Sequence, residues 1–162
     1  MKIAVMGYSG SGKSYLAQFL SGKYEIPAMN LDEVAFDKQW HRIPDEQIMP
    51  GIRSFMAQES WIIDGNYDSL FLEERLNTAD QIIIVNLPAL QCLWRALKRS
   101  QERAAQGYVN DINPWFIRFL LFDCRMPKRR RLYRAIRKTY PEKTVLLRSQ
   151  RQINRFMKTA GR

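Results

Sequence analysis

Near its start the chain reads Gly7-Tyr8-Ser9-Gly10-Ser11-Gly12-Lys13-Ser14, a match to the pattern Gly-x-x-x-x-Gly-Lys-Ser/Thr. An apolar run, residues 3–6, comes directly before this stretch, and the helical spacing of Leu16, Phe19 and Leu20 follows it. A strand, a glycine-rich turn and a helix in this order are the context in which the pattern binds phosphate. This context favours a phosphate-binding loop over the alternative, a glycine-rich turn with a solvated lysine.

Phosphate chemistry accounts for these residue types. Glycines let backbone N–H groups converge on one point, and a helix that begins near Lys13 adds unpaired N–H groups and the positive end of its dipole. We expect Lys13 to reach the β- and γ-phosphates of ATP, and the Ser14 hydroxyl to ligate Mg²⁺. The predicted nucleotide-binding residues of this stretch are Gly7, Ser9, Gly10, Ser11, Gly12, Lys13 and Ser14.

Other apolar runs recur along the chain, at residues 61–64, 82–85 and 144–147, with a weaker one at 26–31. They are continuous rather than alternating, which is typical of parallel strands covered on both faces. Helical spacing separates them. The sequence therefore predicts an α/β protein in three layers, with the fold of the P-loop nucleotide-binding proteins.

The helical segments have recognisable faces and ends. Leu90, Leu93, Trp94 and Leu97 predict an apolar face on the helix after run 82–85. Asn113-Pro114 reads as an N-cap followed by proline at the first helical position, and a further helix is expected between Pro127 and Pro141. Residues 45–57 also have helical spacing, although Pro50 weakens that prediction.

Two aspartates follow predicted strands, where ligands of open α/β sheets bind. Asp64 ends the run 61–64, and Asp32 follows the run 26–31. Phosphoryl transfer uses one carboxylate for the metal and often another for the attacking hydroxyl. We predict Asp64 in the metal shell, with a turn residue before Gly65 as the alternative. Asp32 is either the acceptor-orienting base or a cap of the next helix.

Arg95, Arg99 and Arg103 form one stripe on the helix after run 82–85. Guanidinium groups stabilise the charge of a phosphoryl group in transfer, so Arg95 and Arg99 are candidate catalytic residues. A solvated face is the alternative, and we favour it for Arg103. His41, the only histidine, is interpreted as a surface or half-buried residue, and Asp37 is a poorer candidate than Asp32.

Charge is unevenly distributed over the 162 residues, whose formal net charge is +10. Residues 1–90 hold 7 lysines and arginines against 12 acidic residues, and residues 91–162 hold 19 against 4. The basic run at 128–131 continues through Arg134, Arg137 and Lys138. It fits a clamp over nucleotide phosphates or a nucleic-acid surface. The aromatic residues just upstream are interpreted as core or lid packing rather than base stacking; they are Trp115, Phe116, Phe119 and Phe122.

The length predicts a single domain over residues 1–162. No stretch approaches the roughly 20 apolar residues of a membrane helix, so we expect no membrane partner. Cys92 and Cys124 lack metal-ligand spacing, which argues against a zinc site and a disulfide framework. These features favour a cytoplasmic location.

Several segments together resemble the bacterial DNA topology modulation protein family, which is adenylate-kinase-like. The resemblance covers nearly the whole chain, and Trp61-Ile62-Ile63-Asp64-Gly65-Asn66-Tyr67 is its most specific part. The other segments are residues 7–14, 79–80, 88–99 and 147–149. The family implies five parallel strands in the order 2-3-1-4-5 and a short helical lid, here at about 105–131, without the cysteines of a zinc lid.

The adenylate-kinase relatives also imply roles for individual residues. Their RxxxR pair matches Arg95 and Arg99, and their adenine-binding loop corresponds to residues 148–150, which makes Arg148 a candidate nucleotide ligand. Where they have Asp-Gly-Phe-Pro-Arg, this chain has Asp-Gly-Asn-Tyr-Asp at residues 64–68. The arginine that grips a nucleoside monophosphate is therefore missing, and a neutral hydroxyl acceptor stays open beside a phosphate one.

The leading hypothesis is a Mg²⁺-dependent kinase that moves the γ-phosphoryl of ATP to a small hydroxyl or phosphate acceptor. Its predicted catalytic residues are Lys13, Asp32, Arg95 and Arg99, and its predicted metal ligands are Ser14 and Asp64. The alternative is a nucleotide-responsive, DNA-associated protein whose basic half binds the phosphate backbone. The acceptor, the preferred base and the oligomeric state do not follow from the sequence.

Overall fold

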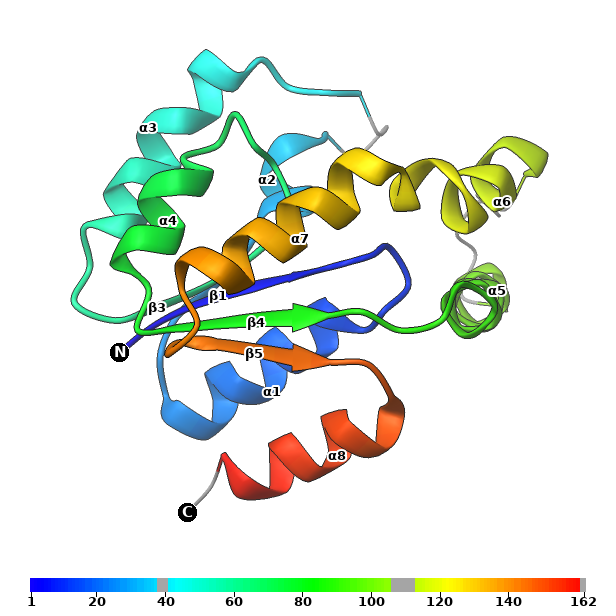
Figure 1. Ribbon diagram of the computed structural model, residues 1–162. Helices are drawn as coiled ribbons and strands as arrows, with labels where there is room; N and C mark the ends of the chain where they lie inside the picture. Colours follow the sequence, from blue (N-terminus) through cyan, green and yellow to red (C-terminus); the bar gives the residue numbers. More distant parts are fainter. Residues whose placement is uncertain (38–40, 106–112, 161–162) are drawn as a thin grey trace.

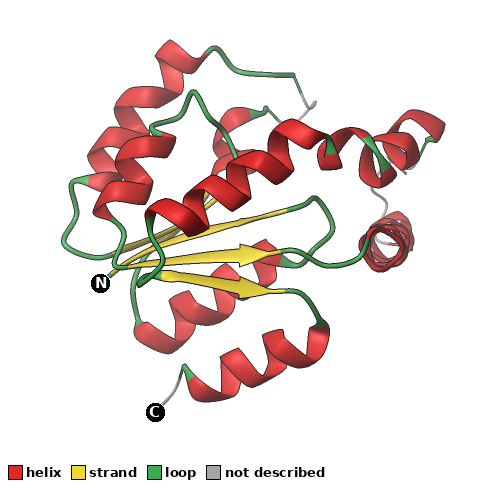
Figure 2. Ribbon diagram, in the orientation of Figure 1, coloured by secondary structure: helices red, strands yellow, loops and turns green. Residues whose placement is uncertain are grey.

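The computed structural model describes residues 1–37, 41–105 and 113–160, which form three layers around one parallel sheet (Figures 1 and 2). The strands are β1 (Lys2–Gly7), β2 (Ala28–Asn30), β3 (Trp61–Asp64), β4 (Gln81–Val85) and β5 (Thr144–Leu147). They lie in the order β2-β3-β1-β4-β5, and every neighbouring pair is parallel. The predicted α/β class and strand order are confirmed. The weak run at 26–31 proves to be a strand of only three residues.

Helices cover both faces of the sheet. The helices are α1 (Lys13–Tyr24), α2 (Leu31–Ala35), α3 (Asp45–Met56), α4 (Leu72–Thr78), α5 (Ala89–Ala105), α6 (Pro114–Leu121), α7 (Pro127–Thr139) and α8 (Gln150–Thr159), with a short 3₁₀ turn, η1 (Asp123–Arg125). On one face lie α2, α3, α4 and α7, on the other α1 and α8, and α5 and α6 lie beyond the carboxyl ends of β1 and β4 (Figure 1).

This layering explains why the strands are apolar along their whole length. In β1, Ala4 and Met6 belong to the core beneath α2, α3, α4 and α7, whereas Ile3 and Val5 belong to the core beneath α1 and α8. Successive side chains of a strand point to opposite faces, so a strand with helices on both sides must be apolar at every position. The sheet is thereby held in place from both sides, and its carboxyl edge is fixed.

Several predicted helix ends are confirmed. The Asn113 side chain accepts a hydrogen bond of 2.9 Å from the Phe116 N–H and so caps α6. Pro114 and Pro127 occupy first-turn positions of α6 and α7. Pro50 lies inside α3, which continues through it to Met56.

The predicted apolar face of α5 is wrong. Leu90 and Trp94 are 73% and 62% exposed, Leu97 is exposed and Leu93 is only half-buried. The buried side chains among the described residues of this helix are Cys92, Ala96 and Ser100. At Cys92 the helix approaches the backbone of the glycine-rich loop closely. A Cβ on Gly10 would lie 2.5 Å from the carbonyl oxygen of Cys92. Close approach therefore overrides the pattern of large apolar residues.

No helix within residues 1–37, 41–105 and 113–160 has both the length and the apolar character needed to cross a bilayer.

Candidate functional site

The glycine-rich loop joins β1 to α1 and has the backbone that its sequence predicts. Gly10 and Gly12 have φ values of +73° and +88°, in the region that favours glycine, and Gly12 is the N-cap of α1. A Cβ on Gly12 would lie 2.9 Å from Nη1 of Arg95. The Ser11 N–H donates to the Tyr8 carbonyl over 3.1 Å and closes the turn. The loop therefore presents its amides and the start of α1 at the carboxyl edge of the sheet.

Asn66 holds the beginning of this loop. Its side-chain oxygen accepts a hydrogen bond of 3.1 Å from the Gly7 N–H, and its side-chain nitrogen donates to the Gly7 carbonyl over 2.5 Å. Tyr133 on α7 donates to the same Asn66 oxygen over 3.1 Å. The loop is thus tied to the chain after β3 and, through Tyr133, to α7.

Lys13, Ser14, Asp32 and Asp64 come together beside the loop. The Ser14 hydroxyl donates to Oδ2 of Asp64 over 2.5 Å. The Lys13 ammonium nitrogen lies 3.8 Å from Oδ1 of Asp64 and 3.6 Å from Oδ2 of Asp32. Burial raises the pKa of Asp64 above its ordinary value of 3.8, while the Lys13 charge and the Ser14 hydrogen bond act in the opposite direction. All four residues were predicted from the sequence, and the fold places them in one cluster.

The donor atoms around Asp64 fit a magnesium ion. Oδ1 of Asp64 is buried and has no hydrogen-bond partner, and the Ser14 oxygen lies beside the same carboxylate. Mg²⁺ prefers oxygen ligands and is usually held by one or two protein groups, with water and substrate phosphates completing its shell. No group of three histidine, cysteine or acidic side chains that could hold a metal occurs among the residues described. Asp64 and Ser14 therefore suit a magnesium site in which the protein supplies one or two ligands and water and substrate phosphates supply the others.

Asp32 lies in the first turn of α2, but it is not the cap of that helix. The cap is Asn30, whose side-chain oxygen accepts from the Asp32 N–H over 3.0 Å. The Asp32 carboxylate instead accepts a 2.5 Å hydrogen bond from the Tyr67 hydroxyl. Burial, with this bond as a smaller cause, raises the pKa of Tyr67 above its ordinary value of 10.0, so its hydroxyl remains a donor at neutral pH. Of the two sequence interpretations of Asp32, capping is excluded.

The three arginines of the predicted stripe separate. Arg95 donates to the Ser11 carbonyl over 2.9 Å and to the side chain of Gln150, so it links the loop to the start of α8. Arg99 is exposed, and the side chain of Arg103 lies outside the described residues. Arg148 is also exposed, with its backbone N–H bonded to Gln152. Among the described side chains of Arg95, Arg99 and Arg148, it is therefore Arg95 that contacts the loop.

Sequence reasoning missed two arginines at the start of the basic segment. The Arg125 guanidinium lies 4.2 Å from the centre of the Tyr8 ring and donates to the Leu87 carbonyl over 3.0 Å. Arg129 donates to the Asn66 carbonyl over 3.0 Å. The run of basic residues gave no signal for which of its members turn inward, since that depends on the path of α7 across the sheet. Arg125 thus connects η1 to the loop, and Arg129 connects α7 to the segment after β3 that holds the loop.

Arg75 is a further residue without a sequence signal. Its guanidinium is buried and donates to the carbonyls of Leu70, Gly65 and Tyr67 at 2.8–3.1 Å. Burial lowers the pKa of Arg75 to about 10. Three backbone carbonyls satisfy this buried cation and hold the segment after β3 in a fixed shape. That segment carries Asn66 and Tyr67, so Arg75 supports the site from behind.

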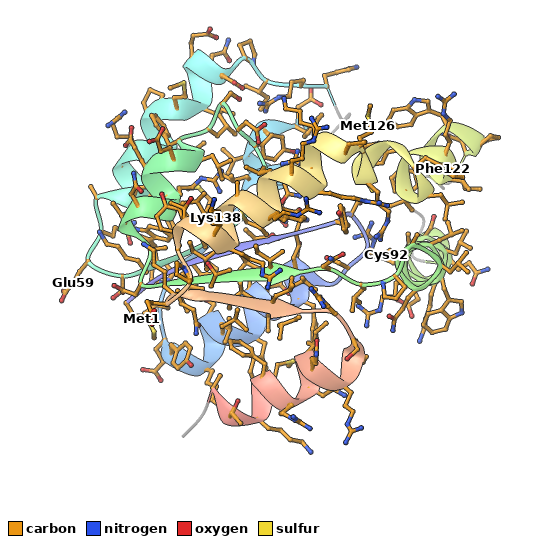
Figure 3. All side chains as sticks on the ribbon, in the orientation of Figure 1. Met1, Glu59, Cys92, Phe122, Met126 and Lys138 are labelled. Atoms are coloured by element: carbon orange, nitrogen blue, oxygen red, sulfur yellow. The ribbon has the colours of Figure 1, made fainter. Side chains whose placement is uncertain are left out.

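The predicted lid is described in part. Residues 106–112 lie outside the described ranges, and α6, η1 and the first turn of α7 form the remainder. Phe116 and Phe119 are half-buried, as expected for packing, but Trp115 and Phe122 are exposed. Figure 3 shows Phe122 and Met126 on the segment between α6 and α7, and Cys92 on α5.

The remaining candidates lie apart from the cluster. His41 is 79% exposed and contacts Asp37 at 3.2 Å, which confirms its interpretation as a surface residue. Cys92 and Cys124 both have free thiols. Burial raises the pKa of each thiol, so both are protonated at neutral pH.

Comparison with known proteins yields likeness in structure alone. No family model and no curated protein matches the chain. A candidate kinase from Chloroflexus aurantiacus aligns with a TM-score of 0.58 and 15% identity, over 97% of this chain and 94% of that one. An uncharacterized protein from Eubacterium ventriosum aligns with a TM-score of 0.54 and 20% identity, over 99% and 98%. A gluconokinase from Sinorhizobium meliloti aligns with a TM-score of 0.56 and 15% identity, over 98% and 88%. At these identities the likeness shows the fold alone, a parallel five-stranded sheet in the order β2-β3-β1-β4-β5 between two layers of helices, with a glycine-rich loop after the first strand.

Proposed function

We propose that the protein is a Mg²⁺-dependent phosphotransferase that moves the γ-phosphoryl group of ATP to a small acceptor. The observation that carries this proposal is the cluster of Lys13, Ser14 and Asp64 beside a glycine-rich loop at the carboxyl edge of the sheet. The fold shared with a gluconokinase supports the reaction class. The resemblance to the DNA topology modulation family is compatible with this activity.

Each residue of the cluster has a role in this reaction. The loop amides and Lys13 bind the phosphates, and Lys13 draws charge from the γ-phosphoryl group. Ser14 and Asp64 hold Mg²⁺, which supplies further charge neutralisation when bound. Asp32 orients the acceptor hydroxyl and receives its proton. Arg95 stabilises the loop and the developing charge.

We assign the other predicted residues to the edges of the site. Arg99 and Arg148 are exposed. They would contact the nucleotide only if α5 and the loop after β5 closed over it. Residues 105–131 act as a lid that excludes water during transfer. The whole chain, residues 1–162, works as a single domain in this proposal.

The first test combines nucleotide binding with turnover in a pair of variants. Calorimetry with Mg·ATP and Mg·GTP measures donor binding, and ADP release measures turnover against a panel of nucleosides, nucleotides and sugars. Lys13→Ala should abolish turnover while leaving the circular dichroism spectrum unchanged. Lys23→Ala is the matched control, because Lys23 lies at the exposed end of the same helix. Full turnover in Lys13→Ala, or absence of any nucleotide binding to the unmodified protein, would refute the proposal.

A second candidate function is binding of nucleic acid, and one observation favours it. The outward face of α7 carries six exposed basic side chains, namely Lys128, Arg130, Arg131, Arg134, Arg137 and Lys138. A basic helical face of this kind releases counterions from a phosphate backbone. This function would be favoured over the kinase if duplex DNA binding fell steeply as the salt concentration rises and no acceptor received a phosphoryl group.

A further inference from the structure

The acceptor side of the site is organised around Asp32. Its carboxylate is 42% exposed, so one edge faces solvent. Oδ1 is held by the Tyr67 hydroxyl at 2.5 Å, and Oδ2 lies 3.6 Å from the Lys13 nitrogen. Each oxygen thus has a separate partner, and the carboxylate cannot rotate without losing one of them. Because Lys13 is expected to bind the γ-phosphate, Oδ2 is the oxygen on the side where we expect the transferred phosphoryl group.

A small pocket lies between Asp64 and two residues that flank Asp32 in the chain, Asn30 and Glu33; Asp32 itself does not line it, and no basic side chain does. Its volume is about 80 Å³, and its lining includes Glu33 and Asp64. The other polar residues in its lining are Ser14, Gln18 and Asn30, which are neutral. Oδ1 of Asp64, a side chain with 1% exposure, lies at this pocket without a hydrogen-bond partner. A buried polar atom of this kind indicates a missing ligand, and the magnesium ion assigned above to Asp64 is that ligand.

Nearby cations are already bound to the protein itself. Arg42 pairs with Asp45 and donates to the Ala35 carbonyl. Arg129 pairs with Asp68 at 3.3 Å. Within the described part of the chain, the cation that remains beside Asp32 is Lys13, which the triphosphate requires.

We propose that the acceptor is a hydroxyl compound without an anionic group, because Asp32, Glu33 and Asp64 repel phosphate and carboxylate, and the described arginines beside them, Arg42 and Arg129, are paired within the protein. This inference rests on the proposed function and names the class of its second substrate. An acceptor hydroxyl donates a hydrogen bond to Asp32, whereas a phosphate or carboxylate meets like charge. Nucleoside monophosphates and sugar acids are therefore excluded as preferred substrates.

The reaction balances with this assignment. The acceptor oxygen forms a bond to the γ-phosphorus while the bond from that phosphorus to the β,γ-bridging oxygen breaks. The hydroxyl proton passes to Asp32, and ADP leaves with the bridging electron pair. Tyr67 is a positioning residue in this scheme, since it contacts Asp32 and not the reacting atoms.

The decisive experiment measures whether the acceptor site takes a phosphate. Diadenosine pentaphosphate contains an ATP portion and an AMP portion. It therefore binds more tightly than ATP only where the acceptor site also binds the AMP phosphate. Calorimetry should give a Kd within about threefold of that for ATP. A probe that binds tenfold or more tightly than ATP would overturn the inference. Absence of ATP binding would instead refute the proposed function itself, so the two failures are distinct.

A second experiment compares related acceptors with and without an anionic group. The pairs are adenosine and AMP, glucose and gluconate, and glycerol and glycerol 3-phosphate, each at equal concentration with Mg·ATP. The uncharged member should be used with a kcat/KM at least tenfold higher. Equal or better use of the charged member contradicts the assignment. Transfer to none of the six counts against the kinase function, and the calorimetry still decides the charge that the site accepts.

The charge argument also predicts the effect of two matched variants. Glu33→Gln removes a carboxylate at the pocket, so it should narrow the preference for the uncharged member of a pair by threefold or more. Glu46→Gln, on the exposed face of α3, should leave that preference unchanged. Identical preference in Glu33→Gln and the unmodified protein would remove Glu33 from the acceptor site.

Discussion

The Asp64 carboxylate ends β3 almost fully buried, and burial raises its pKa above 3.8. A carboxyl group whose pKa is raised by folding favours the folded state most when it is protonated. Its favourable contribution is complete below the unfolded pKa and is lost as the pH rises through the folded pKa. Above its folded pKa the ionised Asp64 therefore lowers the free energy of unfolding, and a bound cation would offset that cost.

Replacing the Asp64 carboxylate should raise the free energy of unfolding and remove the stabilising effect of a bound metal ion. Without nucleotide and metal, Asp64→Asn should unfold at a higher temperature at pH 7, by about 2–4 °C for each kcal/mol gained. The difference from the unmodified protein should shrink toward pH 4. Thermal denaturation between pH 4 and 8 measures this, with Glu59→Gln as an exposed control. A lower melting temperature for Asp64→Asn at pH 7 would show that its contacts with Lys13 and Ser14 outweigh its burial.

The loop glycines permit a second comparison between single residues. Gly10→Ala places a Cβ 2.5 Å from the Cys92 carbonyl at a φ of +73°, and such backbone strain costs about 1–3 kcal/mol. Gly22→Ala meets no atom within 4 Å inside α1 and should stabilise the protein by about 0.5–1 kcal/mol. Urea unfolding gives both values. Equal stability of the two variants would contradict the assigned loop geometry.

At the scale of elements, periodicity predicted the strands and most helices, because burial on both faces leaves a direct mark on the sequence. It failed for α5, where Ala96 is buried and Leu90 is exposed. It also failed for Tyr67, Asn66 and Arg125, whose roles arise from contacts between elements far apart in the chain. Lys13, Ser14 and Asp64 could be predicted because their positions are set by a local motif and by the end of a strand.

Because α5 buries its small side chains and exposes its large apolar ones, substitutions on its two faces should have different effects on stability. Ala96→Leu adds volume to the buried face and should cost about 1–3 kcal/mol. Leu90→Ala changes a side chain that is 73% exposed and should alter stability by no more than about 0.5 kcal/mol. Chemical denaturation of the two variants distinguishes them. The opposite ranking would mean that the large apolar side chains of α5 form part of the core.

For the molecule as a whole, nucleotide binding should appear as stabilisation. At 100 times its Kd a ligand adds about 2.7 kcal/mol to the free energy of unfolding. For a protein of this size that corresponds to an increase in Tm of about 5–10 °C. Mg·ATP should produce this increase in the unmodified protein and little or none in Lys13→Ala. An equal increase in both would show that the nucleotide binds elsewhere.

The carboxamide of Asn66 bonds to both the N–H and the carbonyl of Gly7, two residues beyond the last paired positions, Val5 and Asp64. A side chain here imitates a peptide group and adds a rung to the ladder between β1 and β3. Because this rung exists before any ligand arrives, the entrance to the loop is preorganised. Nucleotide would then arrive at a ready-made receptor, and its rate of association would depend on diffusion and charge steering rather than on folding of the loop.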